Sequence, residues 1–134
     1  MNVEFKGSYD REKNLSIVQY IGTPKTKEEI EYLANKSMEI WRGDGVNKVW
    51  NITDLSGMGM ASPQLVIHYN KVIKDFVKDY LADYVVVAKS TMQRIATSLF
   101  NTFMGERHTI VESLDEAKKV IDGWQAEKGR RIPL

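Results

Sequence analysis

The chain has 134 residues, no cysteine, and 19 lysines and arginines against 18 aspartates and glutamates, for a formal net charge of +1. This length suits a single domain. The lack of cysteine excludes disulfides, thiolate nucleophiles and cysteine-held metal clusters. The balanced charge gives no reason to expect a nucleic acid or an anionic membrane as partner.

No stretch has the roughly 18 uncharged apolar residues of a membrane span, and residues 1–6 lack the basic start and apolar run of a secretion signal. We therefore expect a cytoplasmic protein without a membrane span. The domain is expected to cover residues 1–127. Residues 128–134 are a short basic tail, expected to fray rather than to bind nucleic acid.

The first half of the chain predicts two strands, a helix and a third strand. Polar and apolar residues alternate over residues 3–5 and 15–21, and the segment between them is polar and rich in turn formers, which favours an antiparallel hairpin. Thr26 and Glu29 have the spacing of a capping box and predict a helix that stops near Gly43. Residues 46–53 form the next predicted strand.

A long helix and a buried strand follow. Ser62 and Pro63 are the residue types that favour an N-cap and a first helical position, and an amphipathic pattern runs on from them. Residues 84–88 are apolar without alternation, which is typical of a parallel strand covered on both faces. This strand is therefore expected near the centre of the sheet.

The last third of the sequence predicts a helix, a strand and a helix. Ser90 begins a segment with helical spacing that ends near Gly105, and residues 108–111 form a short strand. Ser113 caps the final helix. The order β-β-α-β-α-β-α-β-α predicts one α/β domain, with a mostly parallel sheet, an antiparallel N-terminal edge hairpin and about four helices.

Four segments carry a family pattern that covers nearly the whole chain. They are Asp-Leu-Ser-Gly at residues 54–57, the buried strand 85–88, the helical segment 92–100 and residues 111–117. With the order of elements, they resemble the STAS family, the sulphate-transporter and anti-sigma-factor-antagonist domains, in its SpoIIAA-like branch. That branch overlaps the CRAL-TRIO lipid-binding group.

The resemblance implies a single SpoIIAA-like domain that is not an enzyme and needs no cofactor. It implies a regulatory, signalling role through protein–protein interaction, with an unknown protein partner and as a homodimer. The alternative is a domain that binds or senses a small ligand, an acyl lipid or an anion. That alternative predicts an apolar pocket between the second and third helices, lined by Phe76, Phe100 and Phe103.

The resemblance also singles out one serine. In antagonist members of the family, a serine at the start of the second helix is phosphorylated by a partner kinase. Ser62 stands at the corresponding helix start, which makes it the candidate phosphorylation site. Its neighbours Ala61 and Pro63 differ from the acidic or serine residue and the glycine of the family's pattern.

Polar side chains follow two of the predicted strands, at the carboxyl edge where open parallel sheets bind ligands and partners. A helix N-terminus at this edge favours an anion. The competing interpretation is that the two serines that begin helices only cap them. The candidate residues are Asp54, Ser56 and Ser62 after the third strand, and Lys89, Ser90 and Thr91 after the fourth.

The loop at residues 57–60 reads Gly-Met-Gly-Met and is expected to be flexible. Met58 and Met60 either form an adaptable contact surface for a partner or an acyl chain, or fold back over the core.

The sequence holds no recognisable catalytic group. His68 and His108 lie on different elements without a carboxylate at ligand spacing, which predicts no metal site. Neither a phosphate-binding loop nor a Gly-x-Ser-x-Gly turn is present. The tryptophans are expected in the core, and Trp50 and Trp124 are also candidates for a contact between two copies of the chain.

Overall fold

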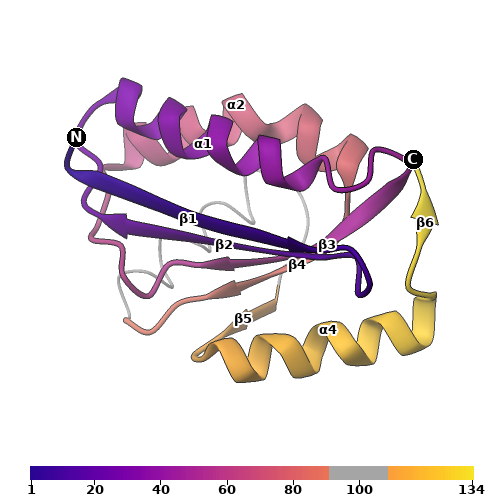
Figure 1. The fold of residues 1–134 in the computed structure, drawn as a ribbon. Coiled ribbons are helices and arrows are strands. Elements are labelled where there is room, and N and C mark those ends of the chain that lie inside the picture. The colour runs from indigo at the N-terminus through magenta and orange to yellow at the C-terminus, as the bar shows by residue number, and fades with distance from the viewer. Residues whose placement is uncertain (91–108) are drawn as a thin grey trace.

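A mixed sheet forms the middle layer of the fold (Figure 1). The computed structural model describes residues 1–90 and 109–134. Within them, five strands lie side by side in the order β1-β2-β3-β4-β5, and a sixth pairs with β3. The strands are β1 (Val3–Asp10), β2 (Leu15–Gly22), β3 (Asn47–Asp54), β4 (Leu81–Val87), β5 (Thr109–Val111) and β6 (Ile132–Pro133).

Helices cover both faces of this sheet. In Figure 1, α1 (Lys27–Trp41) and α2 (Pro63–Tyr80) lie on one face, and α4 (Leu114–Lys128) lies on the other. The described residues thus hold three helices. The helix expected between Ser90 and Gly105 falls largely outside the described residues, so the predicted total of about four helices stays a prediction.

The strand directions agree with the predicted hairpin and parallel sheet. β1 and β2 are antiparallel, whereas β2–β3, β3–β4 and β4–β5 are parallel. The strand in the middle of the order is β3, not β4 as expected, although β4 is also flanked on both sides. The mixed α/β class and the single domain are therefore confirmed.

Serine and threonine caps begin all three described helices, as predicted. The side chains of Thr26, Ser62 and Ser113 accept hydrogen bonds from the backbone N–H three residues on, at 3.1, 3.3 and 3.2 Å. Each bond satisfies a helix N–H that has no partner within the helix. The Glu29 carboxylate accepts hydrogen bonds from the backbone N–H of Lys25, one residue before the cap, and from that of Asn2.

Alternation along the central strand divides the core into two layers. On β3, Val49 belongs to the cluster beneath α1 and α2, while Trp50 and Ile52 belong to the cluster beneath α4. On β4, Val86 and Val85 divide in the same way. Both strands are buried on two faces, which explains why the sequence of β4 shows no polar alternation.

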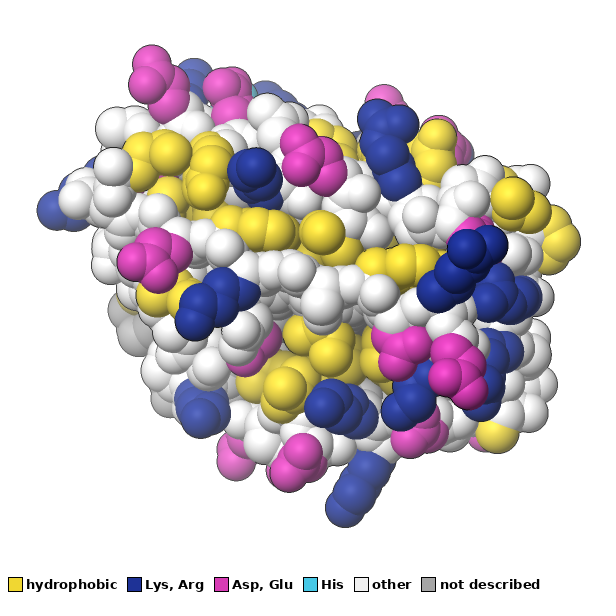
Figure 2. Space-filling model, in the orientation of Figure 1, with side chains coloured by type: hydrophobic (Ala, Val, Ile, Leu, Met, Phe, Trp, Pro, Cys, Tyr) yellow, Lys and Arg dark blue, Asp and Glu magenta, His cyan; other side chains and the backbone are white. Residues whose placement is uncertain are grey.

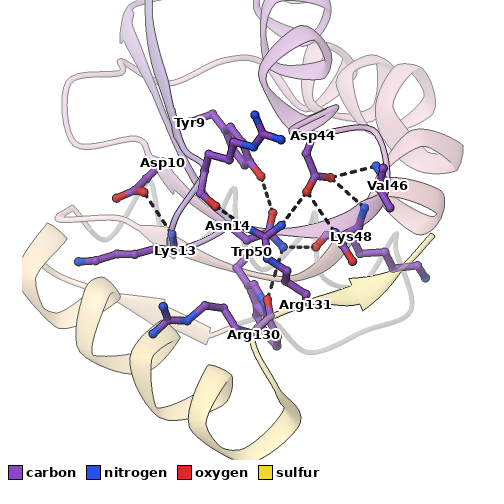
Figure 3. A network of polar contacts seen from close by, with 12 residues as sticks. Tyr9, Asp10, Lys13, Asn14, Asp44, Val46, Lys48, Trp50, Arg130 and Arg131 are labelled. Atoms are coloured by element: carbon purple, nitrogen blue, oxygen red, sulfur yellow. Dashed lines mark hydrogen bonds and ion pairs between the residues drawn. The ribbon is translucent and has the colours of Figure 1, made fainter.

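The C-terminal residues do not fray, and that expectation is wrong (Figure 3). The Arg130 carbonyl accepts a hydrogen bond from Trp50 Nε1 at 2.8 Å. The Arg131 guanidinium bonds the Asp44 carboxylate and the Arg11 carbonyl, each at 2.7 Å. Residues 132–133 pair antiparallel with the start of β3 as β6. The tail is therefore fastened to the sheet by its backbone and by one arginine.

Asn14 anchors the turn between β1 and β2 to this tail. It is fully buried and has φ +52°, a conformation that asparagine tolerates better than most residues. Its Nδ2 donates to the Lys48 carbonyl at 2.7 Å, and its Oδ1 accepts from the Tyr9 hydroxyl at 2.7 Å. The same Nδ2 also donates to the Arg130 carbonyl at 3.4 Å, so the hairpin turn, the start of β3 and the C-terminal residues meet at one buried side chain.

Two of the tryptophans lie in the interior. Trp41 and Trp50 are 1% and 0% exposed. The suggestion that Trp50 contacts a second copy of the chain is therefore wrong. None of the described helices is long and apolar enough to cross a membrane.

Candidate functional site

The polar residues predicted at the carboxyl edge of the sheet do lie together. Asp54 pairs with Val87 across β3 and β4, and the Leu55 N–H donates to the Val87 carbonyl at 2.9 Å. The two loops therefore leave the sheet side by side, with exposed Lys89 and Ser90 on the second. Thr91 lies outside the described residues.

Asp54 serves the loop rather than a ligand. Its carboxylate is buried and accepts hydrogen bonds from Gln19 Nε2 and from the Ser56 backbone N–H, both at 2.9 Å. These bonds fix the first turn after β3. A carboxylate held at this edge also opposes an anion there, so the geometry gives the predicted anion site little support.

The loop at residues 55–61 is tied to the end of β2, which does not fit the flexibility expected of it. Gly22 donates to the Gly57 carbonyl and accepts from the Gly59 N–H, both at 3.0 Å. A Cβ added to Gly59 would lie 2.0 Å from Thr23 Oγ1, so this close approach requires glycine.

This anchoring turns the two methionines in different directions. Met58 packs against the core, together with Leu55, whereas Met60 is 48% exposed. Met58 therefore folds back over the core, as one of the two alternatives predicted, while a partner or acyl-chain contact at the exposed Met60 stays a prediction.

Ser62 follows directly and is exposed as the N-cap of α2. The first turn of α2 has no acidic residue, whereas α1 and α4 each have two there. The positive end of the α2 dipole is therefore not offset by a local carboxylate.

A pocket lies beneath α1 and α2, on the side of the sheet where the loop 55–61 folds inward. We call it the α1/α2 pocket. It measures about 80 Å³ and is bounded by side chains of α1, α2, β2, β3 and β4, with Leu55, Met58 and Ala61 of the loop at its wall. Native cores leave few voids larger than a water molecule, so this space exceeds what packing alone requires.

The walls of the α1/α2 pocket are mostly apolar, but two buried asparagines belong to them. Asn51 on β3 is fully bonded: its Oδ1 accepts from Trp41 Nε1 at 3.0 Å, and its Nδ2 donates to Thr53 Oγ1 at 2.8 Å. Asn70 on α2 is 1% exposed, and its Oδ1 is the one buried side-chain N or O atom among the described residues that has no hydrogen-bond partner.

Tyrosine hydroxyls complete the polar part of the pocket. Tyr20 shares hydrogen bonds with Ser37 and Tyr69, each at 2.5 Å. Burial raises the pKa of Tyr20 to about 12 and raises that of Tyr69 well above its usual value. These two tyrosines therefore stay protonated at physiological pH. None of the described lining residues is an aspartate, glutamate, lysine, arginine or histidine, so the pocket is neutral.

The aromatic residues expected to line a pocket are placed differently. Phe76 does not line the α1/α2 pocket: its ring stacks on Tyr80 with centroids 4.2 Å apart, and the Arg42 guanidinium lies 5.6 Å from its centroid. Phe100 and Phe103 lie outside the described residues. The pocket lies instead between the first and second helices.

The structure corrects the expectation that His68 has no carboxylate near it. His68 Nε2 lies 3.0 Å from the Glu31 carboxylate, so a carboxylate does face it across α1 and α2. Within residues 1–90 and 109–134, no group of three or more histidine, aspartate or glutamate side chains is placed to hold a metal ion. His108 is outside the described residues.

Comparison with known proteins identifies the fold. No family model matches the sequence, and no curated protein matches it. A crystal structure of an uncharacterized DUF3478-family protein with a SpoIIAA-like fold, from Shewanella loihica PV-4, superposes with a TM-score of 0.63 at 12% identity over 90% of this chain and 94% of that one. The chain has a SpoIIAA-like fold.

A second structure agrees with that assignment. An anti-sigma factor antagonist from Mycobacterium paratuberculosis superposes on the SpoIIAA-like domain with a TM-score of 0.53, at 14% identity over 89% of this chain and 95% of that one. The resemblance to STAS domains is thus confirmed as a resemblance of fold. At such identities the site chemistry has to be argued from this chain's own residues.

Sequence reasoning located the loop of the SpoIIAA-like domain but missed the pocket behind it. The pocket-lining residues come from six separate segments, and neither Asn70 nor Asn51 belongs to a motif. The one signal available was an asparagine at position 70 on the apolar face of an amphipathic helix, where a polar residue calls for an explanation.

Proposed function

We propose that this protein is a non-enzymatic, STAS-like regulatory module that binds a protein partner through the start of α2. The observation that carries the proposal is the exposure of two large apolar side chains, Met60 (48%) and Ile67 (45%), which come two residues before and five residues after the exposed cap Ser62 in the sequence. We call these three residues the α2-start surface.

The α2-start surface is unusual among the described residues. Five large apolar side chains are strongly exposed in the described part of the chain, those of Met1, Val46, Met60, Ile67 and Leu134. Met1 precedes β1. Val46 and Leu134 lie where the C-terminal residues pair with the start of β3, and the Leu134 N–H donates to the Val46 carbonyl there; we call residues 44–48 and 132–134 the C-terminal strap. Met60 and Ile67 belong to a different segment, the loop before α2 and the second turn of that helix. Apolar side chains of this kind, with an unbranched methionine among them, suit an adaptable protein contact.

The charge distribution fits a protein partner better than a polyanion. Figure 2 shows lysine and arginine side chains interspersed with aspartate and glutamate over the face in view, rather than gathered into a patch of one sign. The net charge of +1 agrees with this. Nucleic acids and anionic membranes are bound by concentrated positive charge.

Ser62 is proposed as the residue that regulates this contact by phosphorylation. A phosphate on the N-cap would face the backbone N–H groups and the positive dipole end of α2, where no acidic residue of the first turn opposes it. The added charge would lie in the same short segment as Met60 and Ile67, so we expect it to change the binding of a partner there.

The two other predictions about partners have less support. An acyl lipid needs more room than the pocket's 80 Å³, since small-molecule pockets usually measure about 300–1,000 Å³. Assembly into a homodimer stays a prediction, to be tested by sedimentation of the purified chain.

The test compares capture by matched variants. Tagged wild-type chain, Met60→Ser, Ile67→Ser and the control Val46→Ser are used to capture proteins from a lysate of the native cell. We expect a protein that is retained by the wild type and by Val46→Ser and is lost with the other two. Equal retention by all four chains, or capture of nothing, contradicts the proposal.

A further inference from the structure

The α1/α2 pocket has a size, a polarity and one unfulfilled hydrogen bond that together describe a ligand. We propose that it binds a small neutral molecule, of about the size of a five- or six-membered ring, that carries one N–H or O–H donor for the Asn70 side-chain oxygen. This inference does not depend on the α2-start surface or on its partner.

The size of the ligand comes from the volume of the pocket. A single buried water needs roughly 10–15 Å³ of such space, and the α1/α2 pocket measures about 80 Å³. It therefore has room for several heavy atoms but not for a chain of the length of a fatty acid.

The charge of the ligand comes from the lining. Among the described lining residues there is no aspartate, glutamate, lysine, arginine or histidine. The tyrosines stay protonated because burial raises the pKa of Tyr20 to about 12 and that of Tyr69 well above its usual value. A charged ligand would lose its hydration without a counter-charge to replace it, so the ligand is neutral.

The polar group of the ligand comes from the asparagines. Both side-chain groups of Asn51 are bonded within the protein, at 2.7 to 3.0 Å. Asn70 Oδ1 is buried without a partner among the described residues, although the side chain belongs to the pocket wall. An acceptor in that state is best satisfied by a donor on the ligand, because buried polar groups are nearly always hydrogen-bonded.

The pocket is tied to the exposed loop by the loop's own residues. Leu55, Met58 and Ala61 line it, and Met60 and Ser62 of the same segment face outward. An occupant would therefore press on the inner side of the segment that carries the α2-start surface.

Pyrrole and furan test the proposal directly, because these five-membered rings have nearly the same shape and only pyrrole has an N–H donor. Each is titrated into the isotope-labelled full chain, and the methyl signals of Ile30, Ile73 and Val77 are followed by NMR. We expect pyrrole to bind about tenfold more tightly than furan, a ratio typical of one buried hydrogen bond. The methyl signals of the pocket should shift more than those beneath α4.

Two variants assign the preference to Asn70. In Asn70→Leu the ratio of the pyrrole and furan affinities should fall to about one, while in Asn35→Leu, at an exposed position of α1, it should stay near ten. The proposal is overturned if neither ring shifts the pocket methyl signals, if the wild type binds both equally, or if Asn70→Leu keeps the preference for pyrrole.

Discussion

Two buried asparagines line the same pocket, and the same substitution should move stability in opposite directions at the two positions. Asn70 and Asn51 are each 1% exposed. Asn70 Oδ1 is without a partner in the described part of the chain. Leaving such an acceptor buried costs about 1–3 kcal/mol, and replacing it by an apolar group of similar shape removes the penalty. Asn70→Leu should therefore stabilise the protein by about 1–3 kcal/mol.

Asn51→Leu should have the reverse effect. Its Oδ1 accepts from Trp41 Nε1 and from Ser16 Oγ, at 3.0 and 2.7 Å. Leucine would leave the indole N–H of the buried Trp41 without its acceptor. Breaking a buried network of this kind destabilises by about 2–4 kcal/mol.

Urea unfolding followed by tryptophan fluorescence measures both effects. The urea midpoint of Asn70→Leu should rise with an unchanged slope. In thermal unfolding, the same gain for a domain of this length corresponds to a rise in Tm of about 3–10 °C. A midpoint for Asn70→Leu that lies below that of the wild type would refute the reasoning, because it would mean that the Asn70 oxygen makes a stabilising bond. Equal losses at both positions would refute it as well.

Three further changes test other parts of the structure. Deleting residues 130–134 removes the acceptor of Trp50 Nε1 and the ion pair to Asp44, so the free energy of unfolding should fall by about 2–4 kcal/mol; an unchanged urea midpoint would mean that the tail is not docked. Met58→Ser should lower Tm by several degrees and Met60→Ser should not; equal losses would argue against the loop geometry. Hydrogen bonds from the backbone N–H groups of Asn47 and Val46 hold the pKa of Asp44 well below its usual range. The ionised carboxylate therefore stabilises the fold above the unfolded-state pKa of about 4, and this contribution fades as the pH falls further. The stability gap between the wild type and Asp44→Asn should be full at pH 6–7 and shrink below pH 4, and a gap that does not change with pH would contradict this.

Local signals in the sequence predicted the elements well because each depends on a few neighbouring residues. A serine or threonine side chain that accepts a hydrogen bond from the backbone N–H three residues on favours the start of a helix, and all three described caps make this bond. Strands buried on two faces leave an apolar run, as in β4. The hairpin followed from alternation on either side of a polar turn.

Contacts made by the backbone left no such signal. β6 is two residues long, and its neighbour Arg130 is held through its carbonyl, which every residue possesses. The basic side chains suggested a solvated end, whereas Arg131 meets Asp44, 87 residues earlier in the chain. Pairings at such separation cannot be read from composition.

The positions of the candidate functional residues also depend on contacts that their local sequence does not indicate. Met58 and Met60 have the same residue type and neighbouring glycines, and their directions are set by the hydrogen bonds of Gly57 and Gly59 to Gly22. The Asp54 carboxylate was expected to face a ligand, and it instead accepts hydrogen bonds from the Gln19 side chain and from the backbone N–H of Ser56 in its own loop. The pocket is lined by side chains from separate helices, strands and a loop, so no single segment of the sequence indicates it.

Hydrogen–deuterium exchange in the complex tests the central claim most directly. The protein captured by the wild-type chain is purified with it, and exchange of the backbone N–H groups is compared in the free chain and the complex. The α2-start surface predicts slower exchange over residues 55–68 in the complex and unchanged exchange over residues 44–48 and 132–134. Slower exchange at the strap or along α4, with residues 55–68 unchanged, would contradict the proposed site of partner binding.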